Sequence, residues 1–142
     1  MLLRALYLHS FLRIIHNILT REEQYVEDLD TIEATFIQPL ATANPPVVPP
    51  DQLERFIDDV FGNILDLREC NRRLIEVLYV RQREQAPIIY RIGDIFLDVA
   101  AEFRLAYPDY IGHYPIAEKR MKDELETNHE FRLFLEVNFI LH

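Results

Sequence analysis

The feature that most constrains this chain is an apolar pattern of helical period that runs through nearly its whole length. In the first segment the pattern repeats at steps of seven, four, three and four residues, along Ile18, Tyr25, Leu29, Ile32 and Phe36. This spacing marks one face of an α-helix. It predicts a single helix from about Phe11 to Leu40, roughly 45 Å long at 1.5 Å per residue. A helix of that length in 142 residues favours an elongated bundle.

Proline and glycine divide the rest of the chain into further helices. Pro39 and the proline-rich stretch 41–50 predict the end of the first helix and an extended linker. Capping-box spacing at Asp51–Glu54 predicts the next helix start, and Gly62 with Asn63 predicts a break. Later helices are expected over about 64–85, 88–105 and 107–126, with a last one opened by a second capping box at Thr127–Glu130.

The predicted fold class is therefore all-α, an elongated helical bundle. Only three glycines occur in the chain, which disfavours an all-β fold with many tight turns. In the later helices the apolar spacing predicts that Ile111, Tyr114 and Phe139 face the core.

Composition excludes several classes of partner and location. The chain has 15 basic and 24 acidic residues, a formal net charge of −9, and no clustered basic run, so it is not expected to bind nucleic acid. The longest unbroken apolar run near the start, Ala5–Leu8, is too short for a transmembrane segment. The single cysteine, Cys70, cannot form an internal disulfide, which fits a cytoplasmic location.

A second location stays open from the first residues. Met1–Leu19 carries Arg4 and Arg13 and no acidic residue, which is weakly typical of a mitochondrial targeting helix. Ser10 is the only serine in the chain, and this poverty in serine counts against import.

Motifs for covalent chemistry are missing from the sequence. The histidines lack metal-ligand spacing, and neither HExxH, a P-loop, GxGxxG nor GxSxG is present. We therefore expect no cofactor, no metal site and no catalytic residue, and a self-contained enzyme is disfavoured.

Glu22 is a charged residue at a position where the helical pattern calls for an apolar one. At 100° per residue it lies about 20° from Leu29 and about 40° from Ile18, inside the apolar row. A carboxylate there is costly unless it is hydrogen-bonded or faces a partner. Two alternatives stay open. Glu22 could lie at the wet edge of a wide stripe, or Thr20–Glu23 could act as a capping box that starts a helix.

The stretch Ile18–Leu29, ILTREEQYVEDL, resembles the first conserved region of the Dbl homology domain, the catalytic module of Rho-family guanine nucleotide exchange factors. Glu22 matches the family's glutamate and Tyr25 begins its Tyr-Val pair, whereas Arg21 stands where the family usually has Thr or Ser. Further stretches resemble later family segments in the same order: Phe61–Leu67, Ile92–Leu97, Tyr107–Tyr110 with Tyr114, and Asn128–Leu135.

The resemblance implies a regulator of a small GTPase that performs no covalent chemistry. Such a domain binds the switch regions of a Rho-family GTPase, displaces Mg²⁺ and loosens the nucleotide, so that GDP leaves. Glu22, Arg21 and Tyr25 are the residues expected to bind the GTPase. The resemblance divides the chain into an N-terminal helical extension at 1–13, a partial Dbl homology domain at 14–136 and a non-matching tail at 137–142. Any recruitment to a membrane is left to other domains or partners.

The family's third conserved region is expected after Glu136, but the chain reads VNFILH there. The resemblance thus covers the N-terminal two-thirds of the module, as in a C-terminally truncated domain, and exchange activity is expected to be impaired. The alternative function is a helical scaffold or inactive exchange-factor fragment that binds partners without exchange. Which GTPase is used and the oligomeric state are not determined by the sequence.

Overall fold

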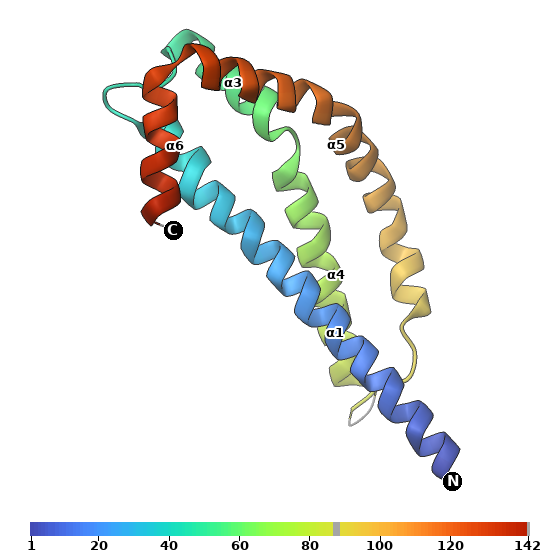
Figure 1. Cartoon of the computed structure of the whole chain (residues 1–142). Helices are drawn as coiled ribbons and strands as arrows, with labels where there is room; N and C mark the ends of the chain where they lie inside the picture. The colour runs from blue at the N-terminus through green and yellow to red at the C-terminus, as the bar shows by residue number, and fades with distance from the viewer. Residues whose placement is uncertain (87–88, 142) are drawn as a thin grey trace.

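The computed structural model describes residues 1–86 and 89–141, with the side chains of residues 140 and 141 excepted, and every regular element in these ranges is helical. The elements in chain order are α1 (Leu2–Ile32), the π-helical turn η1 (Glu33–Ile37), α2 (Gln38–Thr42), α3 (Pro50–Phe61), α4 (Ile64–Glu84), α5 (Gly93–Thr127) and α6 (His129–Leu141). They form an elongated bundle in which the first turns of α1 project beyond the other helices (Figure 1). The all-α, elongated prediction is confirmed.

The core is a series of three apolar clusters strung along the bundle. In the first, Ile15 and Leu19 of α1 pack with Leu74 and Leu78 of α4 and with the start of α5. The second centres on Leu67 beneath the end of α1, and the third joins α2, α3 and α6 around Phe56. Because α4 packs against both α1 and α5, α4 carries the contacts that hold the two long helices in place.

The first helix begins earlier than the sequence pattern predicts, and its helical path ends close to the predicted Leu40. It begins at Leu2 rather than near Phe11, and the helical path continues through Pro39 to Thr42. A proline ring clashes with the carbonyl four residues back in a regular helix. The π-helical turn Glu33–Ile37 lies directly before it and changes that spacing, so the chain passes Pro39 without ending the helix.

The two helices predicted over 88–105 and 107–126 are wrong, because the structure has one helix, α5, with Pro108 and Pro115 inside it. The predicted start at Ile88 lies outside the described residues. α5 curves over the bundle (Figure 1). Since α5 packs against α3 and α4 from one side, its outer side stays in solvent, and Ile111, predicted to be inward, is 67% exposed. Tyr114 does lie on the inner side of α5, where it lines an open hollow shared with α6, and it is 56% exposed there.

The helix boundaries also correct both predicted capping boxes. Gly62 separates α3 from α4 as predicted, with a φ of 56° that favours glycine. However, α3 starts at Pro50, which fits its first turn as a proline with no N–H to satisfy, and Asp51 makes no cap hydrogen bond. α6 is capped by Asn128 rather than Thr127, because the Asn128 Oδ1 accepts a hydrogen bond from the Phe131 amide at 3.0 Å.

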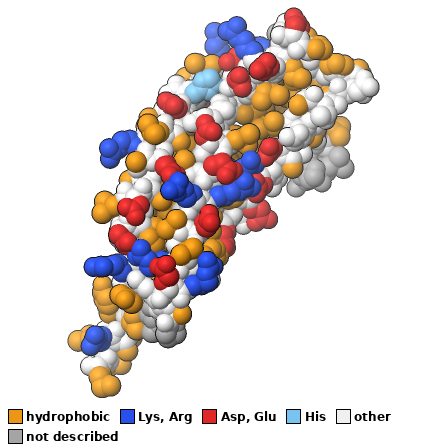
Figure 2. All heavy atoms as spheres, turned by 180° about the vertical axis from the view of Figure 1, so that it is seen from behind, with side chains coloured by type: hydrophobic (Ala, Val, Ile, Leu, Met, Phe, Trp, Pro, Cys, Tyr) orange, Lys and Arg blue, Asp and Glu red, His pale blue; other side chains and the backbone are white. Residues whose placement is uncertain are grey.

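Apolar side chains also reach the surface. Phe139, predicted to face inward, is 79% exposed near the end of α6. Figure 2 shows hydrophobic side chains gathered at the projecting end and at the opposite end of the bundle, with acidic and basic side chains mixed between them. Within the described ranges, no helix has the length and apolar character that crossing a membrane demands.

Candidate functional site

The site is built around Glu22, which lies in the middle of α1 on the side that turns toward α4. Its side chain is half-buried. The Oε2 atom of Glu22 accepts a hydrogen bond of 2.8 Å from Nδ2 of Asn71 on α4. The prediction that Glu22 enters an apolar row is thus matched by a structure in which the carboxylate is partly withdrawn from water and held by a hydrogen bond, as a buried polar group requires.

Asn71 is itself fixed from the opposite side. It is 3% exposed, and its Oδ1 accepts a hydrogen bond of 3.1 Å from the Tyr107 hydroxyl. Tyr107 belongs to α5, so the chain of hydrogen bonds from Glu22 through Asn71 to Tyr107 crosses α1, α4 and α5. We call these three residues the Glu22 network. Its position in the middle of the bundle makes the direction of the Glu22 side chain depend on how all three helices pack.

The electrostatics leave the Glu22 charge unmatched inside the protein. Within 1–86 and 89–141, no basic side chain comes within ion-pair distance of its carboxylate, and Oε1 makes no hydrogen bond to any described residue. Burial raises the pKa of Glu22 above its ordinary value, and the Asn71 hydrogen bond opposes that rise. The result is a hydrogen-bond acceptor in apolar surroundings with one oxygen still available, which is suited to a donor from another molecule.

The three residues predicted to bind a partner do not all lie together. Tyr25, one turn along α1 from Glu22, is half-buried and packs against the middle core cluster. Burial, then a hydrogen bond with Tyr107, raises the pKa of Tyr25, so its hydroxyl adjoins the Glu22 network. Arg21 is exposed. The structure therefore brings Glu22 and Tyr25 together through Tyr107 and leaves Arg21 outside the network.

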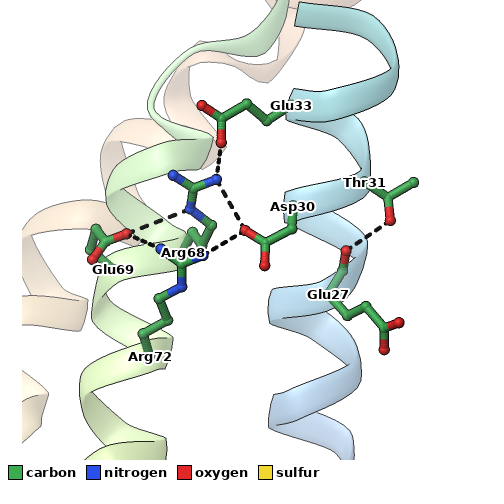
Figure 3. A network of polar contacts seen from close by, with 7 residues as sticks. All are labelled: Glu27, Asp30, Thr31, Glu33, Arg68, Glu69 and Arg72. Carbon is green, nitrogen blue, oxygen red and sulfur yellow. Dashed lines mark hydrogen bonds and ion pairs between the residues drawn. The ribbon is translucent and has the colours of Figure 1, made fainter. Parts of the chain in front are cut away.

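A second polar cluster joins α1 to α4 about two turns further along α1. Arg68 pairs with Glu33 and, at 3.1 Å, with Asp30, while Arg72 contacts Asp30 at 2.7 Å and Glu69 at 2.8 Å (Figure 3). The Arg68 side chain is only 12% exposed. We call these five residues the Arg68 network. Its opposite charges are paired across the two helices, and it fastens the end of α1 that leads into the π-helical turn.

Sequence reasoning missed Asn71, Tyr107 and Arg68. For Asn71 a signal was present. It falls in the buried row of α4 that runs Leu67, Asn71, Leu74 and Leu78, where a polar side chain is as out of place as Glu22 is on α1. Two polar residues that interrupt two apolar rows are candidates to meet, because neither can be left unpaired in the interior. Tyr107 begins one of the segments that the sequence resemblance had marked, but without a role, and no signal marked Arg68.

Outside the two networks, the described residues form an apolar hollow but no group of metal-ion ligands. No cluster of three or more His, Cys, Asp or Glu side chains in the described ranges could hold a metal ion. A hollow of about 440 Å³ lies between the end of α1, the α3–α4 junction, α5 and α6, and its lining includes Phe36, Tyr110 and Phe134. The lining is mostly apolar, with His113 and two tyrosines as its polar side chains and with neither a carboxylate nor a thiol.

Comparison with known proteins assigns the chain to a family. A family model described as the RhoGEF domain matches residues 14–138. Over 122 residues, 85% of this chain, the sequence is 32% identical to Rho1 guanine nucleotide exchange factor 3 of Schizosaccharomyces pombe. It is 35% identical over 118 residues to Rho1 guanine nucleotide exchange factor 2 of the same yeast, 83% of this chain. It is 30% identical over 120 residues to RHO1 GDP-GTP exchange protein 2 of Saccharomyces cerevisiae, 84% of this chain. The aligned parts are 10%, 10% and 9% of those relatives, so the chain spans about a tenth of their length.

Proposed function

The chain belongs to the RhoGEF domain family, and from this premise we propose that it binds a Rho-type GTPase and accelerates release of its bound GDP. The observation that carries the proposal is the half-buried Glu22 carboxylate with one oxygen held by Asn71 and the other without a partner among the described residues. In this proposal the second oxygen accepts a hydrogen bond from the GTPase. Tyr25 adds apolar contact beside it, and Arg21 contacts the GTPase at the exposed rim.

The proposed mechanism uses binding energy alone. An exchange factor favours nucleotide release when it binds the nucleotide-free GTPase more tightly than the nucleotide-loaded form, because only that difference shifts the equilibrium. A hydrogen bond to a carboxylate in a dry interface contributes about 1.5–3 kcal/mol. The Glu22 contact can therefore account for roughly a tenfold to hundredfold part of the preference for the nucleotide-free form.

The alternative function is a helical scaffold that binds partners without exchange. The names of the aligned relatives describe exchange on Rho1, and this supports exchange over scaffolding for the present chain. A Rho1-like GTPase is accordingly the proposed partner. Charge supports the same view, because a chain of net charge −9 suits a partner that presents hydroxyl, amide or basic groups to it.

Nucleotide release tests the proposal directly. A Rho-type GTPase loaded with a fluorescent GDP analogue is mixed with excess unlabelled nucleotide and with the chain, and the fluorescence decay is followed. We expect the wild-type chain to accelerate release and Glu22→Ala to lower that acceleration at least tenfold. The matched control is Glu27→Ala, since Glu27 is exposed on another side of α1; it should retain the wild-type rate. No acceleration by the wild-type chain would contradict the proposal.

A further inference from the structure

We propose that Asn71 is a positioning residue for partner binding: it holds one oxygen of Glu22 so that the other is presented to the GTPase. The inference rests on the proposed function and adds to it a residue that cannot touch the partner. Asn71 is 3% exposed, so it acts on GTPase binding only through other residues, and in this proposal the residue is Glu22, to which its amide nitrogen donates at 2.8 Å.

The chemistry of the amide suits this role. Asn donates a hydrogen bond without bringing a positive charge, so it fixes the carboxylate but leaves its negative charge available. The Arg68 network shows the opposite arrangement on the same two helices, where Arg68 pairs with Glu33 and Asp30. A guanidinium at position 71 would pair with Glu22 in the same way, and the partner would then have to compete with it.

The ionised Glu22 carboxylate can only accept, so it decides which end of the Asn71 amide faces α1, and the Tyr107 hydroxyl, which can donate or accept, satisfies the other end. With the amide nitrogen directed at Glu22, the Tyr107 hydroxyl donates to the Asn71 oxygen at 3.1 Å. The reversed amide would place an oxygen against the Glu22 carboxylate, where neither group could donate. A single arrangement therefore satisfies all three side chains while Glu22 is ionised.

Holding Glu22 in advance lowers the cost of binding. A glutamate side chain that is free to rotate loses rotamer entropy when it makes a contact, and this loss subtracts from affinity. With Oε2 bonded to Asn71, much of that ordering is already complete before the partner arrives. Removal of Asn71 should thus weaken partner binding even though no contact with the partner is lost.

A double-mutant cycle tests this role. The affinity for a nucleotide-free Rho-type GTPase is measured for the wild-type chain, Asn71→Ala, Glu22→Ala and the double variant. We expect Asn71→Ala to weaken binding about fivefold and to have no further effect in the Glu22→Ala background. A loss that persists in that background would show a general structural role and overturn the proposal, as would unchanged affinity in Asn71→Ala.

Asn63→Ala is the matched control. Asn63 also joins α4 to α5, through a hydrogen bond of 2.8 Å from its Nδ2 to the Ala106 carbonyl, but it makes no hydrogen bond to Glu22. It should leave GTPase affinity within about twofold of wild type, the size of a distant structural effect. A fivefold loss in Asn63→Ala as well would overturn the positioning role. If Asn71→Ala does not fold, Tyr107→Phe takes its place in the cycle, with the same dependence on Glu22 and a smaller loss.

A second measurement needs no GTPase and so separates this inference from the proposed function. Carboxyl carbon NMR follows the titration of Glu22 in the wild-type chain and in Asn71→Ala. Because the Asn71 hydrogen bond lowers the pKa of Glu22, its removal should raise that pKa. An unchanged Glu22 titration overturns the positioning role, whatever the exchange assay gives. An absent exchange activity with a shifted titration overturns the proposed function and leaves the Asn71–Glu22 contact established.

Discussion

Two polar clusters join α1 to α4, and they differ in how completely their charges are paired. In the Arg68 network, two guanidinium groups meet three carboxylates, with contacts of 2.7–3.5 Å and a further pair between Arg68 and Glu33. In the Glu22 network, one carboxylate meets a neutral amide, and that amide meets a neutral hydroxyl. Both clusters join α1 to α4; the Glu22 network also reaches α5 through Tyr107, and the Arg68 network also reaches η1 through Glu33.

The difference separates a structural role from a binding role. A buried charge that is already paired has its hydrogen-bonding capacity occupied within the protein, and breaking the pair lowers stability. A half-buried carboxylate without a countercharge lowers stability slightly, and it keeps an acceptor that a partner can use. From this comparison we expect substitutions in the Arg68 network to change folding, and substitutions in the Glu22 network to change binding.

The largest expected effect is on folding. Arg68→Ala removes the partner of Asp30 and Glu33 at a position that is 12% exposed, and we expect the free energy of unfolding to fall by about 2–4 kcal/mol. Chemical denaturation followed by circular dichroism measures this change. Arg73→Ala is the control, because its pair with Glu102 is 63% exposed at the arginine and should cost at most about 1 kcal/mol. Equal losses of unfolding free energy in Arg68→Ala and Arg73→Ala would contradict a special structural role for the Arg68 network.

Glu22→Gln is expected to change binding and not folding. The amide keeps the size of the side chain but loses the charge that strengthens a hydrogen bond, so GDP release should slow by about tenfold, as measured by the decay of a fluorescent nucleotide. Its free energy of unfolding should equal or slightly exceed that of wild type, because burial already disfavours the charged form. A variant that unfolds more easily, with release unchanged, would place Glu22 among the structural residues.

The pH dependence of stability should distinguish Glu22 from paired carboxylates. Burial raises the pKa of Glu22 above 4.5, so the folded chain holds this proton more tightly than the unfolded chain. Its contribution to stability is full below pH 4.5 and declines as the pH rises through the folded-state pKa. Unfolding of wild type and Glu22→Gln at several pH values should show the variant gaining relative stability as the pH rises. If Glu22→Gln instead gained stability relative to wild type as the pH falls, the pKa of Glu22 in the folded chain could not be raised.

The smallest expected effect on stability comes from the ion pair between Arg81 and Asp94. Its pH dependence runs opposite to that of Glu22. Arg81 contacts both carboxylate oxygens of Asp94 at 2.8 and 2.6 Å, and this hydrogen bonding lowers the pKa of Asp94 from 3.8 to about 2. The contribution of Asp94 is therefore present above pH 3.8 and is lost as the pH falls toward 2. Asp94→Asn should reduce stability slightly above pH 3.8 and have less effect near pH 2, as judged by thermal unfolding at both values.

The sequence predicted the fold class and the entry of Glu22 into an apolar helix face for one physical reason. Helical periodicity is local, and a charged residue that breaks an apolar row is visible in that periodicity. The same information predicted the break at Gly62, where a positive φ of 56° favours glycine. These features depend only on residues that are close to one another in the chain.

The features that the sequence did not predict depend on contacts between residues that are distant in the chain. The single helix α5 passes Pro108 and Pro115 because packing against α3 and α4 supports it, whereas local rules favour a break. The pairing of Glu22 with Asn71 joins residues 49 positions apart, and apolar spacing within one helix does not predict which helix lies opposite. The same holds for Arg68 and Asp30, which are 38 positions apart.

The central claim is that the free oxygen of Glu22 recognises the GTPase once its nucleotide has left. The most direct measurement compares wild type and Glu22→Ala for affinity toward one Rho-type GTPase, in the nucleotide-free state and loaded with GDP. We predict a loss of at least tenfold toward the nucleotide-free state, and a much smaller change toward the GDP-loaded state. Equal affinity of the two chains for the nucleotide-free GTPase would contradict the account.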